Sequence, residues 1–384
     1  MAKILYILKH NPWGIGGGCY ACRNYLELFS EIFRNMHIDV LICSEYLKNA
    51  KQTDFANCRF IPVVPRSRFG KYMSPLTGVL HRHNDVAKQM IAENDYDYCI
   101  FDHNSIAGSL VDNCRKAGIK TIVLNHNCEQ EYFRDNNSKI KNLLLLSVVR
   151  RNERHSYKEC DYNIFLTEED EATFKKLYGS SETTSIVGGC FLRKGEKINV
   201  EDDISFDKEN PKIVISGTMG NVQNLDGINY FLDELYRFVP ENMSVVLTGR
   251  NPSVELKEKV AQYNNVRIIE NPENILDIVG QCDIFVCPAR LGGGMKLRII
   301  DGLRCGLPVI AHKVSARGYT HFMKDGVVRQ FERPEEFKDC LEKTLADIKS
   351  QRIDRYKIKG EAENFFCFDS AMNRIKIIIK ISNI

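Results

Sequence analysis

The stretch Asp283–Gly318 decides the fold: DIFVCPARLGGGMKLRIIDGLRCGLPVIAHKVSARG. Its first residues, 283–288, are a short apolar run, which predicts a buried parallel strand. The three glycines at 292–294 then remove every Cβ where the backbone must approach another group closely. We expect a helix to begin at these glycines and to end at the turn 306–308, before a second strand at 309–312. The pattern predicts an α/β fold with parallel strands.

The glycine loop and the helix expected after it predict an anion site. The N-terminus of a helix presents free N–H groups and the positive end of the helix dipole, which together attract phosphate. Lys296 adds a full positive charge beside this loop. A tight strand-to-helix turn with an exposed lysine is the alternative that these residues leave open.

The same segment resembles the donor-site signature of family 4 of the retaining glycosyltransferases, which have the GT-B fold. Members carry an acidic residue before the helix and a Glu on it, followed by a turn like Cys-Gly-Leu-Pro-Val. Asp301 matches the helix acid within IIDGLRCGLPVI, whereas Gly293 stands at the first acidic position. The resemblance implies that Asp301 accepts hydrogen bonds from the ribose hydroxyls of a nucleotide. A solvated helix carboxylate is the alternative.

The resemblance covers essentially the whole chain and implies its organisation. We expect two Rossmann-like domains that face a central cleft, an acceptor domain at 1–190 and a nucleotide-sugar domain at 191–364. Residues 365–384 are expected to form a C-terminal helix that returns to the first domain. The interdomain linker is placed at 188–212, because this segment is polar and lacks a long apolar period.

The activity that the resemblance implies is transfer of a sugar from a nucleotide diphosphate sugar, with retention at the anomeric carbon. The expected acceptor is a glycan, a lipid-linked molecule or another component of the cell envelope. Neither a cofactor nor a metal is expected. The chain has 53 Lys and Arg against 50 Asp and Glu, a net charge of +3, so its charge gives no reason to expect a nucleic-acid partner.

Cysteine usage and the N-terminus favour a cytoplasmic protein. The 14 cysteines are scattered through apolar runs, as reduced thiols in a core are. Met1, Ala2 and Lys3 lead directly into an expected strand rather than into a signal peptide. The longest apolar run, 143–149, is too short to span a membrane. We expect this run to be core; peripheral contact with the inner face of a membrane is the alternative, because basic residues flank it at Lys139, Lys141, Arg150, Arg151 and Arg154.

The N-terminal residues repeat the order strand, glycine loop, helix. A strand is expected at 3–8 and a helix after Gly18. An NAD(P)-dependent oxidoreductase is an alternative here, with Glu45 as its ribose acid, although Cys19 stands where the dinucleotide fingerprint needs a glycine. The glycosyltransferase resemblance instead implies that Gly16 and Gly17 let the donor phosphate or the acceptor approach. The basic segment Pro62 to Tyr72 is expected to be an acceptor-side loop.

Two consecutive expected strands, 98–101 and 121–125, each end in a His-Asn pair. Ligands of open α/β sheets bind at the carboxyl ends of the strands. The resemblance implies that His103 is catalytic beside the transferred sugar, and places three residues on the acceptor side: Asn104, His126 and Asn127. A structural hydrogen-bonding role is the alternative for each histidine. Glu129 and Glu131 are expected to be supporting or solvated groups.

The second domain begins with an expected strand at 213–216, a loop, and a helix at 226–239. Members of the family commonly carry an Arg and a Lys in this loop, but Thr218 and Gln223 stand there. The positive charge for the diphosphate is therefore expected from Lys296 and Arg298, which are predicted to be catalytic together with His103. The residues expected to bind the donor are Gly16, Gly17, Thr218, Arg250, Gly293, Gly294, Met295 and Asp301. Because Gly293 replaces an acid, a catalytically silent protein that binds nucleotide sugar is a further alternative.

Overall fold

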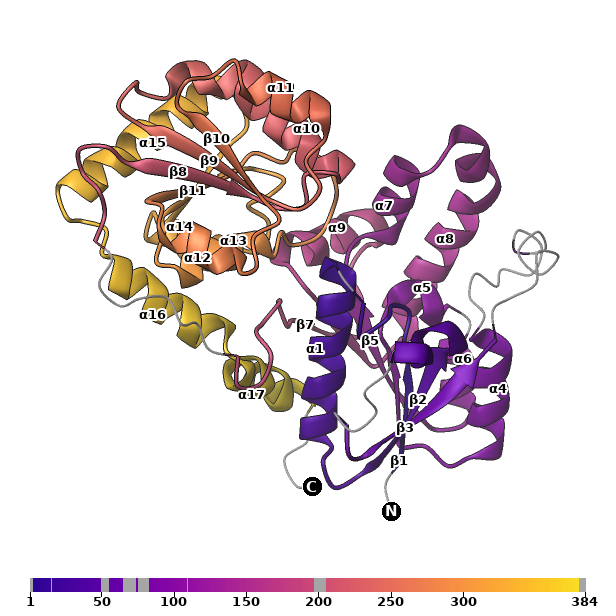
Figure 1. Ribbon diagram of the computed structural model, residues 1–384. Coiled ribbons are helices and arrows are strands. Elements are labelled where there is room, and N and C mark those ends of the chain that lie inside the picture. The colour runs from indigo at the N-terminus through magenta and orange to yellow at the C-terminus, as the bar shows by residue number, and fades with distance from the viewer. Residues whose placement is uncertain are drawn as a thin grey trace. The chain divides into compact units, whose positions relative to one another are not determined.

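The computed structural model describes residues 3–14, 16–49, 55–64, 74, 83–108, 110–196 and 205–379 (Figure 1). The chain divides into two compact units. Unit 1 contains Met1–Gly195 and Cys367–Ile384, and unit 2 contains Glu196–Phe366. The divisions expected from the sequence were after residues 190 and 364.

Unit 1 is built on a parallel sheet of seven strands, in the order β3-β2-β1-β4-β5-β6-β7. Its central strands are buried almost without interruption, as continuous apolar runs predict. The strands are β1 (Lys3–Ile7), β2 (His37–Cys43), β3 (Cys58–Val63), β4 (Tyr98–Phe101), β5 (Lys120–Asn125), β6 (Tyr162–Phe165) and β7 (Thr184–Val187). The expected acceptor-side loop at 62–72 begins inside β3, and its residues 65–72 lie outside the described part of the chain.

The helices of unit 1 begin where their sequence provides caps. Thr167 Oγ1 accepts a hydrogen bond of 3.0 Å from the N–H of Asp170, so Thr167 is an N-cap. The helical segments are α1 (Gly17–Ile32), η1 (Ser44–Asn49), α4 (Asn84–Glu93), α5 (Asn104–Ala107), α6 (Leu110–Lys116), α7 (Glu129–Asn136), α8 (Lys139–Glu159), α9 (Glu168–Tyr178) and α17 (Phe368–Ile379). The C-terminal helix α17 packs against α1 and β7, so the chain end returns to unit 1 as expected.

Helix α8 corrects the expectation for its apolar run. Val148 and Val149 are buried, but Leu143 and Leu144 are exposed, so the first half of the run is not core. The reason is geometric, since consecutive residues wrap around a helix and only one face can pack against the unit. Within the described residues, none of the helices has both the length and the apolar character needed to cross a membrane.

Unit 2 contains a second parallel sheet, of six strands in the order β10-β9-β8-β11-β12-β13. This order, in which the first strand of the unit lies beside both its second and its fourth, is that of a Rossmann fold. The strands are β8 (Lys212–Ser216), β9 (Ser244–Gly249), β10 (Val266–Glu270), β11 (Ile284–Cys287), β12 (Val309–His312) and β13 (Val328–Phe331). Both units are therefore Rossmann-like, as predicted.

The helical segments of unit 2 differ from expectation in where they begin. They are α10 (Val222–Tyr230), η3 (Phe231–Leu235), η4 (Tyr236–Phe238), α11 (Val254–Val260), α12 (Ile275–Gly280), α13 (Arg298–Arg304), α14 (Thr320–Lys324), α15 (Pro334–Lys349) and α16 (Arg355–Phe366). The helix expected at 226–239 begins at Val222, because the Asn221 side chain accepts a 2.9 Å hydrogen bond from the N–H of Gln223.

The helix expected to begin at the three glycines begins only at Arg298. Gly292 and Gly294 have φ of 86° and 71°, values that an α-helix cannot contain. Met295 and Lys296 therefore lie in the loop, and α13 has seven residues. The prediction of a long helix directly after the glycines was wrong, and a phosphate site here depends on side chains rather than on a helix dipole.

Candidate functional site

In unit 2, Arg298 joins the glycine loop to the end of β8. Its Nη1 donates a hydrogen bond of 3.0 Å to the carbonyl oxygen of Ser216, and its Nη2 donates to Asn224 Oδ1. Gly217 has a φ of 142°, and a Cβ there would lie 2.6 Å from Nη1 of Arg298. A side chain at 217 would displace the guanidinium, so this glycine makes room for Arg298.

The ends of β8 and β9 approach each other at a pair of glycines. A Cβ on Gly249 would lie 1.8 Å from the carbonyl oxygen of Gly217, and the φ of Gly249 is 150°. Only glycine fits such a contact. The carboxyl ends of these strands therefore form a tightly packed edge, where open α/β sheets bind ligands.

Lys296 points into the protein rather than into solvent. It is 8% exposed, and its Nζ donates to the carbonyl oxygen of Leu291 at 3.2 Å and to Gln223 Oε1 at 3.5 Å. Burial is the main cause that lowers the pKa of Lys296 from 10.5 to about 8, and nearby Arg298 and Arg317 contribute to this lowering. Among the described residues it forms no ion pair. The alternative of an exposed lysine is wrong.

Asp301 lies on α13 and is half-buried. Burial raises its pKa from 3.8 to about 6, against the opposing effect of Arg304. Arg304 itself forms an ion pair of 2.9 Å with Glu196. In the described part of the chain the Asp301 carboxylate makes no hydrogen bond or ion pair. The alternative of an ordinary solvated carboxylate does not fit this raised pKa.

The other residues expected to bind the donor lie on the same edge of the sheet. Thr218 and Arg250 follow β8 and β9; both are exposed, and the carbonyl oxygen of Arg250 accepts a 2.8 Å hydrogen bond from the N–H of Met219. Gly293, Gly294 and Met295 follow β11 in the glycine loop. The structure thus brings the expected residues of unit 2 together at the carboxyl ends of β8, β9 and β11.

In unit 1, His103 is buried completely and both its ring nitrogens have partners. Its Nδ1 accepts a hydrogen bond of 3.3 Å from the N–H of Ser105, so the proton of the neutral ring is on Nε2. Nε2 lies 3.1 Å from Glu129 Oε1 and 3.2 Å from the Nζ of Lys9. Burial lowers the pKa of His103 from 6.5 to about 3, with Lys9 as the next cause. His103 is therefore a neutral imidazole held in one orientation.

Glu129 is buried beside His103 and Lys9, a position that its place in the sequence did not predict. It is 6% exposed, its Oε1 lies 3.1 Å from the Nε2 of His103, and its Oε2 lies 3.4 Å from the Nζ of Lys9. Glu129 was expected to be a supporting or a solvated group; its burial beside His103 and Lys9 contradicts the solvated alternative and fits the supporting one. Lys9 was missed, although it follows β1 directly and the strand-end rule that selected His103 would have found it.

His126 and Asp102 complete the cluster in unit 1. His126 Nε2 lies 3.3 Å from Asp102 Oδ1, and the His126 ring stacks on His103 with centroids 5.4 Å apart. The ring of His10 lies 6.0 Å from that of His103, and burial lowers the pKa of His10 to about 4. Asp102 is fully buried, and hydrogen bonding and charge attraction from His126 keep its pKa low against the effect of burial.

The remaining predicted residues of unit 1 have different surroundings. Asn104 is buried and donates to Glu153 Oε1 at 2.9 Å, a structural contact. Asn127 is half-buried, and its Oδ1 has no hydrogen-bond partner among the described residues. Gly16 has a φ of 120° with open space around its missing side chain, and Gly17 begins α1.

Metal ligands do not gather in the described part of the chain, where no group of three or more His, Cys, Asp or Glu has the geometry to hold an ion. The sequence contains one Asp-x-Asp triplet, at 95–97. It precedes β4, so it lies at the amino edge of the sheet, where Asp97 Oδ2 accepts a 2.7 Å hydrogen bond from the N–H of Lys3. It is therefore remote from the strand ends that carry the histidines.

Residues 210–347 match the family model described as glycosyl transferases group 1. A protein of 44.6 kDa from the cps region of Klebsiella pneumoniae, uncharacterised by its name, is 24% identical over 345 residues. That match covers 83% of this chain and 84% of the relative.

Solved structures share the fold over nearly the whole chain. HepE of Anabaena in complex with UDP has a TM-score of 0.66 at 12% identity, covering 99% of this chain and 100% of that one. WaaG, a glycosyltransferase involved in lipopolysaccharide biosynthesis, has a TM-score of 0.63 at 15% identity, covering 98% of this chain and 99% of that one. The fold is therefore GT-B, with two Rossmann-like units.

Proposed function

We propose that this chain transfers a sugar from a nucleotide diphosphate sugar to a glycan, a lipid-linked molecule or another cell-envelope acceptor, with retention at the anomeric carbon. The observation that carries the proposal is the buried Lys296, which has no carboxylate partner among the described residues. A buried charge without a partner destabilises a protein, and a bound diphosphate would offset that penalty.

Lys296 and Arg298 would act on charge that develops during the reaction. As the glycosidic bond breaks, its electron pair passes to the leaving diphosphate, whose negative charge grows. Cations fixed beforehand at that position stabilise the transition state more than the ground state. Arg298 is fixed by Ser216 and Asn224, and among the described residues its remaining N–H groups have no partner.

Asp301 would bind the ribose of the donor. An ionised carboxylate accepts hydrogen bonds from two neighbouring hydroxyls, and Asp301 has no protein partner among the described residues for its own oxygens. With a pKa of about 6, it is mostly ionised at neutral pH. We therefore assign nucleotide recognition to α13 and the glycine loop of unit 2.

In unit 1 we assign catalysis to His103, with Lys9 and Glu129 as positioning residues. Because Nδ1 of His103 accepts from Ser105, its protonated Nε2 is a hydrogen-bond donor at neutral pH. Glu129 Oε1 lies 3.1 Å from that Nε2, and Lys9 is 20% exposed beside it. The acceptor-side assignment keeps His126 and Asn127, whereas Asn104 has a structural partner in Glu153.

The family model supports the assignment of the donor site, and the relatives support the choice of donor and acceptor. The matched segment 210–347 contains Lys296, Arg298 and Asp301. HepE binds UDP and WaaG acts in lipopolysaccharide biosynthesis, and the Klebsiella relative is encoded in a cps region. A UDP-sugar donor and a cell-envelope acceptor are therefore the first to test. The dinucleotide alternative receives no support from these relatives.

The decisive experiment combines donor binding with product analysis. Purified protein would be incubated with UDP-, GDP- and dTDP-sugars and a cell-envelope acceptor extract, with and without EDTA. We expect transfer from one donor class, an unchanged anomeric configuration by NMR, and no loss in EDTA, because cations of the chain replace the metal. Binding without transfer would instead favour the catalytically silent protein, and NAD(P) binding the oxidoreductase.

A further inference from the structure

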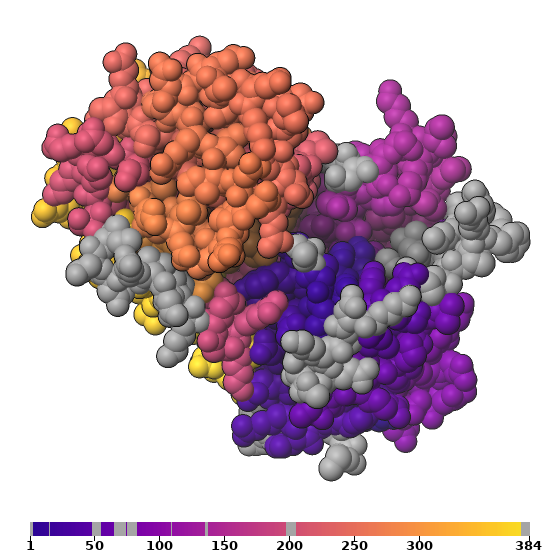
Figure 2. Space-filling view, viewed as in Figure 1, coloured from indigo at the N-terminus to yellow at the C-terminus, as the bar shows by residue number. Residues whose placement is uncertain are grey.

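Glu153 of α8 is a fully buried carboxylate outside the groups assigned to the reaction. It is 0% exposed, and in the described part of the chain no lysine or arginine forms an ion pair with it. Helix α7 packs along α8, and their atoms form the magenta surface at the upper right of Figure 2. Glu153 does not reach that surface, so its charge must be satisfied by hydrogen bonds inside unit 1.

The Oε1 of Glu153 anchors the chain after two different strands. The N–H of Glu129, the first residue of α7, donates to Oε1 at 2.6 Å. The Nδ2 of Asn104, the first residue of α5, donates to the same oxygen at 2.9 Å. Asn104 directly follows His103 in the chain. One oxygen therefore holds the backbone of Glu129 and the residue next to His103.

The Oε2 of Glu153 holds the next residue of α7 and the end of α9. The N–H of Gln130 donates to Oε2 at 3.2 Å, and the Tyr178 hydroxyl donates to it at 2.6 Å. The first N–H groups of a helix need acceptors from outside the helix. Cys128, at the N-cap position of α7, gives no such side-chain hydrogen bond. Glu153 thus caps α7 from a neighbouring helix.

We propose that Glu153 is a positioning residue that sets where His103 and Glu129 stand relative to each other. Its part in catalysis rests on the function proposed above, in which His103 acts on the transferred sugar. The Nε2 of His103 lies 3.1 Å from Glu129 Oε1, and ionised Glu153 fixes the segments that carry both groups. A shift of about 1 Å at a catalytic group can slow a reaction by roughly 100-fold.

Glu153 changes its charge near neutral pH. Burial raises its pKa from 4.5 to about 7, the hydrogen bonds that it accepts act in the opposite direction, and the negative charge of Glu129 raises it too. The other titratable groups in contact with it are Cys128, ahead of α7, and Tyr178, on α9. Burial holds the pKa values of Cys128 and Tyr178 well above neutral. The sequence of α5, NSIA, has no titratable side chain.

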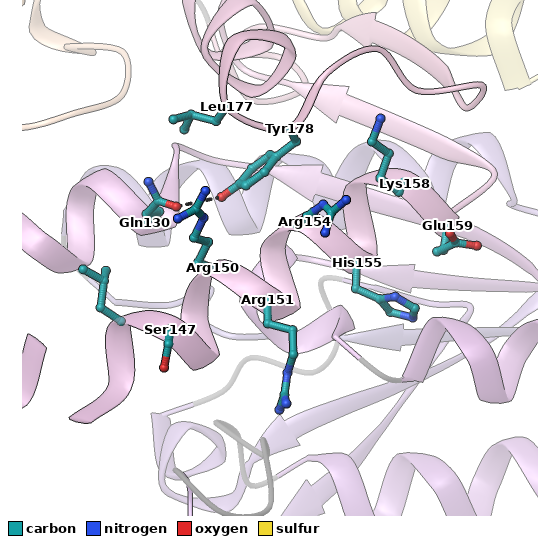
Figure 3. Close-up of a pocket in the computed structure, with 11 residues that line it drawn as sticks. Gln130, Ser147, Arg150, Arg151, Arg154, His155, Lys158, Glu159, Leu177 and Tyr178 are labelled. Carbon is teal, nitrogen blue, oxygen red and sulfur yellow. Dashed lines mark hydrogen bonds between the residues drawn. The ribbon is translucent and has the colours of Figure 1, made fainter. Parts of the chain in front are cut away.

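A proton on Oε2 would loosen the start of α7. The Tyr178 hydroxyl also lies 3.4 Å from the Oε1 of Gln130, so it would accept from protonated Glu153 and donate to Gln130 instead. Tyr178 and Gln130 both line a pocket of about 880 Å³ in unit 1, and a dashed line joins them in Figure 3. The N–H of Gln130 would lose its charged acceptor, and the first turn of α7 would no longer be held in one position.

Histidine NMR tests this role without any sugar donor, so the result does not depend on the proposed function. The imidazole nitrogen signals of His103, assigned by their loss in His103→Asn, would be followed across neutral pH. We expect them to shift with a midpoint near pH 7, although His103 itself has a pKa of about 3. This shift should be absent in Glu153→Gln, because the amide keeps one acceptor oxygen and cannot ionise.

Tyr178→Phe is a second variant that keeps the packing of the ring. It removes one hydrogen bond that stabilises ionised Glu153, so the midpoint of the His103 shift should move up by about one pH unit. This variant decides the matter even if Glu153→Gln fails to fold. The proposal would be overturned by an unchanged midpoint in Tyr178→Phe, by a wild-type shift in folded Glu153→Gln, or by a wild type without the shift.

Turnover links this positioning to the proposed function. With saturating donor, kcat of the wild type should fall below pH 7 with the midpoint of the His103 signal. Glu153→Gln should be roughly tenfold slower above pH 7, without that fall and with unchanged nucleotide affinity. Glu159→Gln, on the same helix, removes a surface pair with Arg115 and should behave as the wild type. An NMR shift that kcat does not follow would uphold positioning by Glu153 and overturn the catalytic role of His103.

Discussion

The Nζ of Lys296, in the glycine loop, lies 3.5 Å from the Oε1 of Gln223, in the first turn of α10. Gln223 stands where the glycosyltransferases that this chain resembles carry a lysine. Lys296 therefore brings a positive charge from the glycine loop to the start of α10, where that lysine is missing. Gly292 permits this meeting, because a Cβ there would lie 2.4 Å from the Gln223 amide.

Replacing Lys296 by Ala should weaken nucleoside diphosphate binding by roughly 10- to 100-fold and nucleoside binding hardly at all. A charge-assisted hydrogen bond to the diphosphate is lost, and the nucleoside never makes it. Isothermal titration calorimetry measures both affinities. The exposed Lys343→Ala, on α15, is the matched control and should change neither. An equal loss for both ligands would remove Lys296 from the phosphate site.

The preference for diphosphate over nucleoside should decline above pH 8. Lys296 has a pKa of about 8 without ligand, so it is charged below that pH and loses its proton above it. The affinity for diphosphate should then fall by up to about tenfold per pH unit, while that for nucleoside stays level. Lys296→Arg should remove this dependence between pH 7 and 9.5, since an arginine stays charged. A level profile in the wild type would contradict the assignment.

Lys296→Met should stabilise the ligand-free protein at pH 7, by about 1 to 3 kcal/mol, because it removes a buried charge. The pKa of Lys296 is lowered by folding, so between about 8 and 10.5 the unfolded chain binds more protons than the folded one. The free energy of unfolding contributed by this group must then rise with pH across that window. Denaturant titrations at pH 7 and pH 10 should show a smaller difference between variant and wild type at pH 10. A destabilised variant at pH 7 would mean that Lys296 is stabilised by groups other than a ligand.

Asp301→Asn should weaken binding of ribonucleotides more than of 2′-deoxyribonucleotides. A carboxylate accepts hydrogen bonds from both ribose hydroxyls, and the amide keeps only one acceptor oxygen. The expected difference is roughly tenfold, measured by calorimetry with matched UDP and dUDP. Asp325→Asn, an exposed change at the end of α14, is the control. Equal losses for both sugars would assign Asp301 a purely structural role.

His103→Asn should lower turnover by roughly 100-fold and leave nucleotide affinity nearly intact. Asn is chosen because His103 also caps α5 through Ser105, and Asn is a good N-cap. Lys296, Arg298 and Asp301 belong to unit 2, so a change in unit 1 should spare nucleotide binding. Initial rates and nucleotide affinity would be measured on the same preparation. Wild-type turnover in a correctly folded variant would show that His103 has no part in catalysis.

Glycines, apolar runs and strand ends allowed much of this protein to be predicted. Runs such as 3–8 and 283–288 indicated buried parallel strands, and both lie in sheets of the expected kind. Because parallel strands end at one edge, the His-Asn pairs and the glycine loop could be placed at such edges without a structure. These are local properties, determined by side-chain polarity and by the lack of a Cβ in glycine.

Contacts between distant residues were decided only by the tertiary structure. Sequence could not show that Glu129 is buried against His103 and Lys9, or that Lys296 reaches Gln223. Leu143 and Leu144 were predicted to be core, but both are exposed. The apolar run 143–149 continues around the helix, so the sequence did not indicate which side packs against the rest of the unit. Which side of a helix is covered, and how far a buried charge is from its partners, depends on packing among elements that are remote in the chain. That packing lowers the pKa of Lys296 to about 8 and raises that of Asp301 to about 6, because burial penalises the charged form of both groups.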